Sequence, residues 1–348
     1  MLCGVGVLLS QALPAAAAEA AYPRVGIRLL TEGNVQDWSP DGQSLVMSKQ
    51  SSAGVWETFL IRPDGSVIKN LNTQVRPGDP PANCDRGNAH FHPSGKYLVM
   101  QVGEREAGCP NVYADPGSGA WTNLWAYELS TGKWTKLTKY SYLPSFKIYG
   151  TLFPNFSRDG SKLVWSKLLA PGDATNVFGR WEMHVATFSL VGGPHLESDK
   201  SYRPGAASFY EPFGFTAGDT EILFSANIGY PTPAETLAST DLWLYNPQND
   251  ALTNWTASPN EYDEHARISP DGRRVVWGSS GDVRIQRIDK ADARQRVTFF
   301  NTCCFEEFQW GTWGWAMAWS PNGKQVVVTQ QFPGNESKNR SWIVTLDA

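Results

Sequence analysis

The chain has 348 residues, of which 41% are hydrophobic and 18% are charged. This composition excludes a disordered chain, a collagen and a coiled coil, which all need more polar or more repetitive sequences. The formal net charge is -4, from 30 basic and 34 acidic residues, and there is no long basic run. A nucleic acid or an anionic membrane surface is therefore not an expected partner.

The first residues have the character of an export signal. Residues 2–18 carry no charge and run from an apolar stretch into small residues. Two small-x-small sequences, Ala16-Ala17-Ala18 and Ala18-Glu19-Ala20, fit a signal-peptidase site. The apolar stretch is shorter than the ~20 residues that a membrane span needs. We expect a signal peptide over residues 1–20, a mature domain over 21–348, no transmembrane span, and a periplasmic or secreted protein.

Four cysteines remain in the expected mature chain: Cys84, Cys109, Cys303 and Cys304. An even number in an exported chain favours disulfides, and the CxxC spacing of a zinc site is absent. Cys84 and Cys109 form the natural pair. The neighbours Cys303 and Cys304 could form a strained, redox-labile vicinal disulfide, and the sequence leaves their pairing open.

One motif recurs along the whole mature chain. Its six copies are WSPDG (38–42), FHPSG (91–95), FSRDG (156–160), FTAGD (215–219), ISPDG (268–272) and WSPNG (319–323). Each copy precedes an apolar, β-rich run such as SLVMS or KLVWSK. In Pro-Asp-Gly, Pro sets φ, Asp accepts hydrogen bonds from the following backbone and Gly supplies a positive φ. The motif therefore predicts a tight turn within a β-hairpin.

A second hairpin follows the first in each unit, as in WETFLI-RPDG-VIKNL and LWAYEL-STG-WTKLT. Four strands in each unit are typical of a β-propeller blade. The last unit ends after its third strand at SWIVTLDA, and the N-terminal RVGIRLLTEG (24–33) resembles the missing fourth strand. We predict a single-domain, all-β, six-bladed propeller whose N-terminal strand closes the ring in the last blade. Closure removes a sheet edge that would otherwise aggregate.

The six Ser-Pro-Asp-Gly-type turns, each followed by an apolar strand, resemble those of the TolB-type, WD40-like six-bladed propellers of exported bacterial proteins. The resemblance covers residues 24–348. It implies a propeller fold, and it implies one of several roles: a periplasmic scaffold, a regulatory domain of a peptidase, or a polysaccharide lyase.

Propeller topology places the tight hairpin turns on one face and the other connections on the opposite face. The long connections are 72–88, 103–121, 139–153, 168–180, 199–212, 226–240 and 299–315. Long loops on a rigid scaffold are where function is normally found. They are rich in aromatic residues, above all in CCFEEFQWGTWGW (303–315). Aromatic rings beside carboxylates suit sugars or peptide side chains, although such rings also serve to pack large loops.

The residues just before each repeat begin the innermost strands, beside the central channel. Three blades supply ionisable groups there: Arg86 and His90, then Glu211, then Asp263, Glu264, His265 and Arg267. His90, Glu211 and His265 are the candidate ligands of a divalent cation, the one cofactor that the sequence indicates. The alternative is that these groups are simply solvated at the channel mouth and have no function.

Three functions remain open. The leading hypothesis is a binding module for a protein, peptide or glycan, which uses its long-loop face through Tyr210, Glu211, Glu264, His265, Trp310, Trp313 and Trp315. The second is a polysaccharide lyase or hydrolase, with His90 or His265 as the base and Arg86 or Arg267 neutralising a uronate carboxylate. The third is an envelope scaffold, whose aromatic loops would form an exposed apolar patch. Distances among His90, Glu211 and His265 discriminate the enzyme from the binding module.

Overall fold

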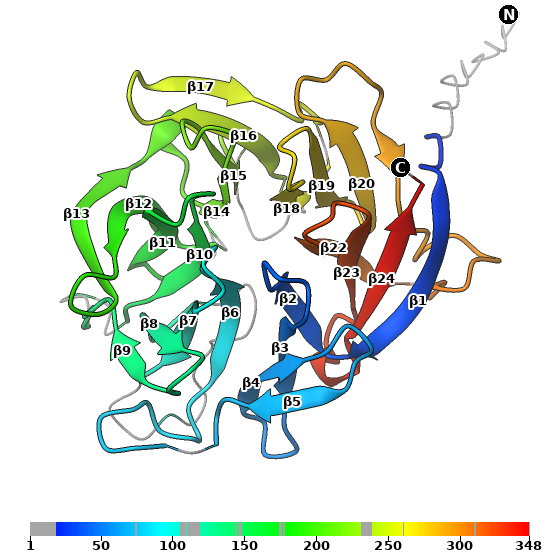
Figure 1. Ribbon diagram of the computed structural model, residues 1–348. Coiled ribbons are helices and arrows are strands. Elements are labelled where there is room, and N and C mark those ends of the chain that lie inside the picture. Colours follow the sequence, from blue (N-terminus) through cyan, green and yellow to red (C-terminus); the bar gives the residue numbers. More distant parts are fainter. Residues whose placement is uncertain are drawn as a thin grey trace, which may run out of the picture.

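The computed structural model describes residues 19–73, 75–104, 109, 119–142, 145, 148–173, 176, 178–230, 239–259, 261–309 and 311–347. Within these residues, 24 strands form six four-stranded antiparallel sheets around a common centre (Figure 1). The predicted all-β, six-bladed propeller is therefore confirmed. Residues 1–18 of the expected signal peptide lie outside the described residues. In the described part of the chain, no helix has the length and apolar character that crossing a bilayer would require.

Five blades each consist of four consecutive strands, numbered from the innermost outward. The first blade contains β2 (Asn34–Trp38), β3 (Leu45–Gln50), β4 (Trp56–Ile61) and β5 (Val67–Asn70). The second blade contains β6 (Arg86–Phe91), β7 (Tyr97–Gly103), β8 (Thr122–Glu128) and β9 (Trp134–Lys136). The third is β10 (Thr151–Phe156), β11 (Lys162–Ala170), β12 (Arg180–Ser189) and β13 (His195–Tyr202). The fourth blade contains β14 (Tyr210–Phe215), β15 (Ile222–Ala226), β16 (Asp241–Asn246) and β17 (Ala251–Asn254). The fifth blade contains β18 (Asp263–Ile268), β19 (Arg274–Ser279), β20 (Asp282–Arg287) and β21 (Gln295–Arg296).

The sixth blade joins the two ends of the chain. It contains β22 (Trp313–Trp319), β23 (Gln325–Gln331) and β24 (Arg340–Leu346), and its outermost strand is β1 (Arg24–Glu32). β1 pairs antiparallel with β24 from Arg24 opposite Leu346 to Glu32 opposite Arg340 (Figure 1). The predicted closure of the ring by the N-terminal strand is confirmed.

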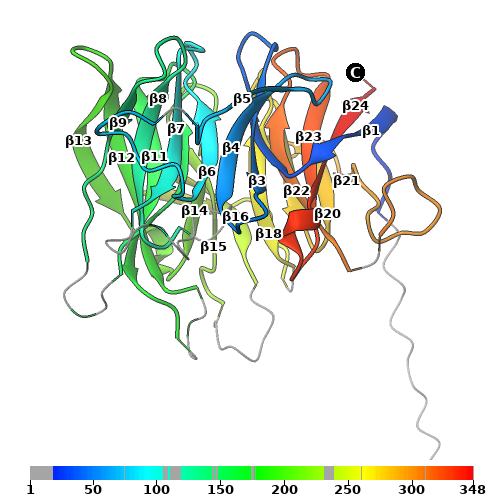
Figure 2. The same cartoon turned by 90° about the horizontal axis from the view of Figure 1, so that it is seen from below.

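The repeated turn has the chemistry that its sequence predicts. In the first copy, Ser39 Oγ donates to Asp41 Oδ1 at 2.6 Å, and the Gln43 amide donates to the same oxygen at 2.9 Å. Gly42 has a φ of +75°, which a side chain would disfavour. Because consecutive strands run antiparallel, these turns lie on one face of the ring, and the long connections lie on the opposite face (Figure 2).

Hydroxyl groups at the ends of the apolar runs tie neighbouring blades together. Ser166 Oγ on β11 donates to the Tyr210 carbonyl on β14 at 2.6 Å. Ser225 Oγ on β15 donates to the Asp263 carbonyl on β18 at 2.7 Å. Both serines are fully buried, so these hydrogen bonds satisfy groups that would otherwise be costly inside the core. The blades that carry Glu211 and Glu264 are thereby held in register.

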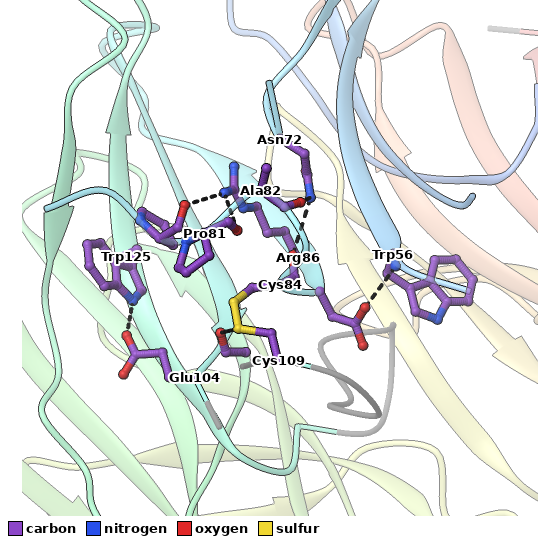
Figure 3. The surroundings of a disulfide bond; sticks show 12 residues. Trp56, Asn72, Pro81, Ala82, Cys84, Arg86, Glu104, Cys109 and Trp125 are labelled. Carbon is purple, nitrogen blue, oxygen red and sulfur yellow. Dashed lines mark hydrogen bonds between the residues drawn. A yellow bond between two sulfur atoms is a disulfide. The ribbon is translucent and has the colours of Figure 1, made fainter. Parts of the chain in front are cut away.

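A disulfide joins Cys84, just before β6, to Cys109, after β7 (Figure 3). This confirms the predicted pair. Cys303 and Cys304 are instead free, exposed thiols, so their assignment as disulfide cysteines is not met. Adjacent Cα atoms are only about 3.8 Å apart, below the ~4.4–6.8 Å that disulfides normally span.

Candidate functional site

Two neighbouring blades bring three ionisable side chains together at the channel. Glu211 lies in β14, and Glu264 and His265 lie in β18; each offers a ligand atom within 4.8 Å of the other two. His265 Nε2 is 3.9 Å from Glu211 Oε1 and 3.5 Å from Glu264 Oε2. All three residues are buried, whereas the sequence suggested solvated groups. Glu211 and Glu264 each stand four residues before a turn motif, and at that position the innermost strand is already buried inside the ring.

A bulge in β18 allows two consecutive residues to reach the same site. The pairing of β18 with β19 shifts register between Glu264 and Arg267, and His265 has a φ of +50°. In a regular strand, consecutive side chains would point to opposite faces of the sheet. Asn88 in the β6 bulge and Phe153 in the β10 bulge each have a φ of +48°, so this conformation is shared by several innermost strands. In β18 it places His265 beside Glu264.

Aromatic rings enclose His265 and keep it neutral. Its ring centroid lies 4.6 Å from that of Trp315 on β22 and 5.0 Å from that of Phe153 on β10. Burial, followed by the positive charge of Arg267, lowers the pKa of His265 to about 3. The imidazole is therefore unprotonated at neutral pH and has a lone pair available for a metal ion.

Burial and mutual repulsion disfavour the state in which the carboxyl groups of Glu211 and Glu264 are both ionised. Burial and the nearby Glu264 carboxylate raise the pKa of Glu211 well above its ordinary value. Burial also raises the pKa of Glu264, while a hydrogen bond from Tyr262 Oη to Glu264 Oε1, at 2.9 Å, acts in the opposite direction. Two adjacent buried carboxylates cannot both be charged without compensation. The site therefore needs either a proton or a cation.

The arrangement of the ligand atoms fits a metal ion. Glu211 Oε1, which faces His265 Nε2, is buried and has no hydrogen-bond partner among the described residues. Metal bonds of ~2.0–2.2 Å to carboxylate oxygen and imidazole nitrogen place neighbouring ligand atoms ~3–4 Å apart. The measured separations of 3.5 and 3.9 Å lie in that range and are too long for good hydrogen bonds.

His90 and Arg267 belong to a second cluster rather than to this one. Arg267 donates from Nε to the Met317 carbonyl at 2.7 Å and from Nη1 to the Ala266 carbonyl at 2.9 Å. Its Nη2 lies 3.4 Å from His90 Nε2, and His90 Nδ1 lies 3.6 Å from Asp37 Oδ2. Burial lowers the pKa of Arg267 to about 10, so it stays charged at neutral pH. Burial also lowers the pKa of His90.

These contacts decide how the predicted residues are grouped. Of the expected metal ligands, the structure brings Glu211 and His265 together with Glu264, whereas His90 contacts Arg267 and Asp37 and is not part of that group. The sequence analysis did not single out Asp37. The signal was its position: Asp37, His90 and Arg267 each directly precede the aromatic or aliphatic residue that opens a turn motif.

Arg86 does not reach the channel, contrary to its predicted place at the mouth. Its guanidinium donates to the carbonyls of Leu71 (2.5 Å) and Pro80 (2.8 Å) and lies 4.5 Å from the centre of the Trp134 ring. Leu71 follows β5 and Trp134 lies in β9, both outermost strands, so the side chain extends outward from β6. Figure 3 shows it beside Pro81, whose carbonyl it also contacts. Arg86 anchors a loop.

The aromatic candidates separate into a core residue and a group beside the carboxylates. Tyr210 is fully buried and donates its hydroxyl to the Pro204 carbonyl at 3.0 Å. Trp313 and Trp315 stack at 5.7 Å, and Tyr262 packs edge-on against both, at 6.0 and 6.3 Å. Tyr262 and Trp313 are half-buried, while Trp315 is buried. Trp310 lies outside the described residues.

The role of Tyr262 was not evident from the sequence. Its hydroxyl holds Glu264 and its ring extends the aromatic group toward the long-loop face. Its position two residues before Glu264 was the available signal. Among the described aromatic residues of the long loops, only Phe305 is exposed, at 39%. The other described aromatic residues of these loops are half-buried or buried.

Comparison with known proteins identifies the fold and leaves the activity open. No protein-family model matches the chain, and no curated protein matches it by sequence. Its structure is similar to that of a TolB candidate from Agrobacterium tumefaciens, with a TM-score of 0.54, 14% identity and 90% of each chain covered. It is also similar to an oligogalacturonate lyase in complex with manganese, with a TM-score of 0.51, 14% identity and coverage of 95% of this chain and 96% of that one.

A gluconolactonase from Xanthomonas campestris has a TM-score of 0.56 and 14% identity, with 96% of this chain and 99% of that one covered. These three proteins have different roles and share the six-bladed architecture. The resemblance to TolB-type propellers is thus met at the level of the fold. At such identities a similarity establishes no shared reaction.

Proposed function

We propose that this propeller binds a divalent cation through Glu211, Glu264 and His265 and, with that cation, binds an acidic saccharide at its long-loop face. The observation that carries the proposal is the set of separations from His265 Nε2, 3.9 Å to Glu211 Oε1 and 3.5 Å to Glu264 Oε2, within a buried cluster. The predicted export of the chain to the periplasm or the medium is part of the proposal.

The ligand set indicates the class of ion. Two carboxylates with one imidazole suit a borderline divalent ion such as Mn²⁺ or Zn²⁺. When bound, such an ion would supply positive charge for an oxygen-rich ligand. Tyr262 orients Glu264 through its hydroxyl, and Trp315 and Phe153 fix the ring of His265. Outer contacts of this kind typically matter for metal affinity.

The ligand class follows from what lies next to the cluster. A metal ion held by three protein side chains has open coordination positions, and a uronate carboxylate of a bound saccharide could occupy them. Trp313 and Tyr262 offer half-buried aromatic faces, on which sugar rings stack. The manganese-bound oligogalacturonate lyase has the same fold, which supports an acidic saccharide over a peptide as the ligand.

The test is calorimetric titration of an oligogalacturonate into the protein, with Mn²⁺ and with a chelator. Binding should require Mn²⁺, and Glu211→Gln should abolish it. Glu182→Gln is the matched control, because Glu182 also contacts a histidine, His184 at 3.1 Å, but outside the channel. Binding that is equal with the chelator, or equal in the Glu211 variant, would refute the proposal.

A cation-assisted lyase is the second candidate, because the manganese-bound oligogalacturonate lyase has the same fold. In this reaction a base removes the C5 proton of a uronate, the C4–O bond breaks and an unsaturated sugar forms. Ultraviolet absorbance of that product discriminates turnover from binding alone. A hydrolase is less well supported: the paired ligand atoms lie within 4.8 Å, whereas glycosidase carboxyls are ~5–9.5 Å apart.

A further inference from the structure

The connection between β21 and β22 carries a second reactive feature, which the proposed function does not use. Cys303 and Cys304 are both exposed, and their Sγ atoms are 3.3 Å apart. They are distinct from Cys84 and Cys109, whose disulfide is buried. Two adjacent accessible thiols in contact form a potential dithiol site.

The loop holds the two cysteines in place from both sides. The Glu307 carboxylate is buried and accepts hydrogen bonds from Arg24 Nη1 at 2.6 Å and from the Phe299 amide at 3.1 Å. Phe305 stacks on Phe299 with ring centroids 4.1 Å apart. The chain on both sides of Cys303 and Cys304 is thus fixed, and the thiols lie at its exposed tip.

The backbone at Cys304 is in an unusual conformation. Its φ of +75° is the largest among the non-glycine residues with positive φ that the structure describes. In an extended segment, neighbouring side chains diverge, so two consecutive thiols would not ordinarily meet. Here the left-handed residue accompanies a contact between the two sulfurs. The conformation needed to close a ring between them is therefore partly formed.

We propose that Cys303 and Cys304 form a thiol–disulfide exchange site that reacts with low-molecular-weight disulfides. The thiolate of one cysteine attacks a sulfur of the small disulfide; its S–S bond breaks, one thiolate leaves and a mixed disulfide forms. The thiolate of the second cysteine then attacks the first cysteine's sulfur, which closes the vicinal disulfide and releases the second small thiolate. The pair gives up two electrons and two protons, and the small disulfide is reduced to two thiols.

Geometry makes this exchange reversible. Adjacent Cα atoms are about 3.8 Å apart, closer than the ~4.4 Å lower limit of ordinary disulfides. A strained, exposed disulfide is readily reduced, so the site should cycle where a structural disulfide would not. Cys84 and Cys109 are at most 5% exposed, and they provide an internal reference that should stay oxidised throughout.

The experiment treats the mildly reduced, full-length mature protein with oxidised glutathione and follows its intact mass. The wild type should lose two hydrogens and keep no glutathione. Cys304→Ser should instead retain one glutathione, because it lacks the second thiol. Dithiothreitol at low concentration should reverse both changes while Cys84–Cys109 remains bonded.

Two results would overturn this proposal. One is a wild-type protein that keeps glutathione without closing the ring, and the other is a wild type that does not react. Equal thermal unfolding midpoints of the wild type, Cys303→Ser and Cys304→Ser would show that the variants are folded. None of these readouts depends on a cation or a saccharide, so the outcome is independent of the function proposed above.

Discussion

Glu211 and His265 come from neighbouring blades, yet Glu211 Oε1 lies 3.9 Å from His265 Nε2 and has no hydrogen-bond partner among the described residues. Glu264 completes the group from the same strand as His265. A register shift of this kind occurs in the innermost strand of all six blades, and in β18 it places His265 beside Glu264. The three side chains could together hold a metal ion.

Metal binding should release protons and strengthen as the pH rises. The pKa of Glu211 is raised by burial and by Glu264, so the metal-free site keeps a proton to higher pH than an ordinary carboxyl group does, and the ion must displace that proton. The pKa of His265 is about 3, so its protonation does not compete above about pH 4. Calorimetry with Mn²⁺ in buffers of different ionisation enthalpy should report proton release on binding. An affinity that does not rise with pH would contradict this assignment.

The metal-free protein should lose stability as the pH rises, and Glu211 should cause part of that loss. The folded-state pKa of Glu211 is above its unfolded value of about 4.3, so the folded state keeps a proton that the unfolded state gives up. This contribution is fully present below about pH 4 and is lost as the pH approaches the folded pKa. Glu211→Gln should flatten the dependence of the free energy of unfolding on pH, measured by urea denaturation with chelator present. Parallel curves for the variant and the wild type would contradict the shift.

Tyr262→Phe and Trp313→Ala should affect different ligands. Tyr262→Phe removes the hydroxyl that orients Glu264 and keeps the ring, so Mn²⁺ affinity should fall about tenfold or more. Trp313→Ala removes an aromatic face and leaves the ligand atoms intact, so saccharide affinity should fall while Mn²⁺ affinity is unchanged. Separate titrations with Mn²⁺ and with oligogalacturonate measure both. If Trp313→Ala weakens Mn²⁺ binding as strongly as Tyr262→Phe does, the division of roles is wrong.

Much of the fold could be predicted from the sequence because its signals are local. Each SPDG-type turn is stabilised by hydrogen bonds between residues close in sequence, such as Ser39 and Asp41, so the repeated turn can be recognised from the amino-acid sequence alone. Ring closure followed from a missing strand, and β1 supplies it. Cys84 and Cys109 pair as expected, because the loops that carry them flank the same two strands.

The site was predicted less completely, because it depends on register inside strands. Sequence position identified Glu211 and His265 but could not show the bulges that decide which side chains meet. The bulge in β6, between Gly87 and His90, separates the outward-pointing Arg86 from His90, which meets Arg267. The contact between Tyr262 and Glu264 is local, two residues apart, but it too depends on the backbone conformation at the start of β18.

Arg267 should be a structural residue whose loss destabilises the ring. It donates to the Met317 and Ala266 carbonyls and contacts His90, all in buried surroundings. Arg267→Gln should lower the free energy of unfolding by about 3 kcal/mol, because buried partners lose their donor. Arg287→Gln is the control, since Arg287 pairs with Asp289 on the surface and should matter little. Urea denaturation compares them, and equal small effects would show that Arg267 is not a structural tie.

The most direct test of the central claim is the metal content of the protein after loading with Mn²⁺ and removal of free ion by gel filtration, measured by inductively coupled plasma mass spectrometry. The wild type and Glu182→Gln should each retain about one ion per chain, as expected of a single cluster with three protein ligands. Glu211→Gln and His265→Ala should retain none, with unchanged circular dichroism. Retention by all four proteins, or by none of them, would contradict a cation site formed by Glu211, Glu264 and His265.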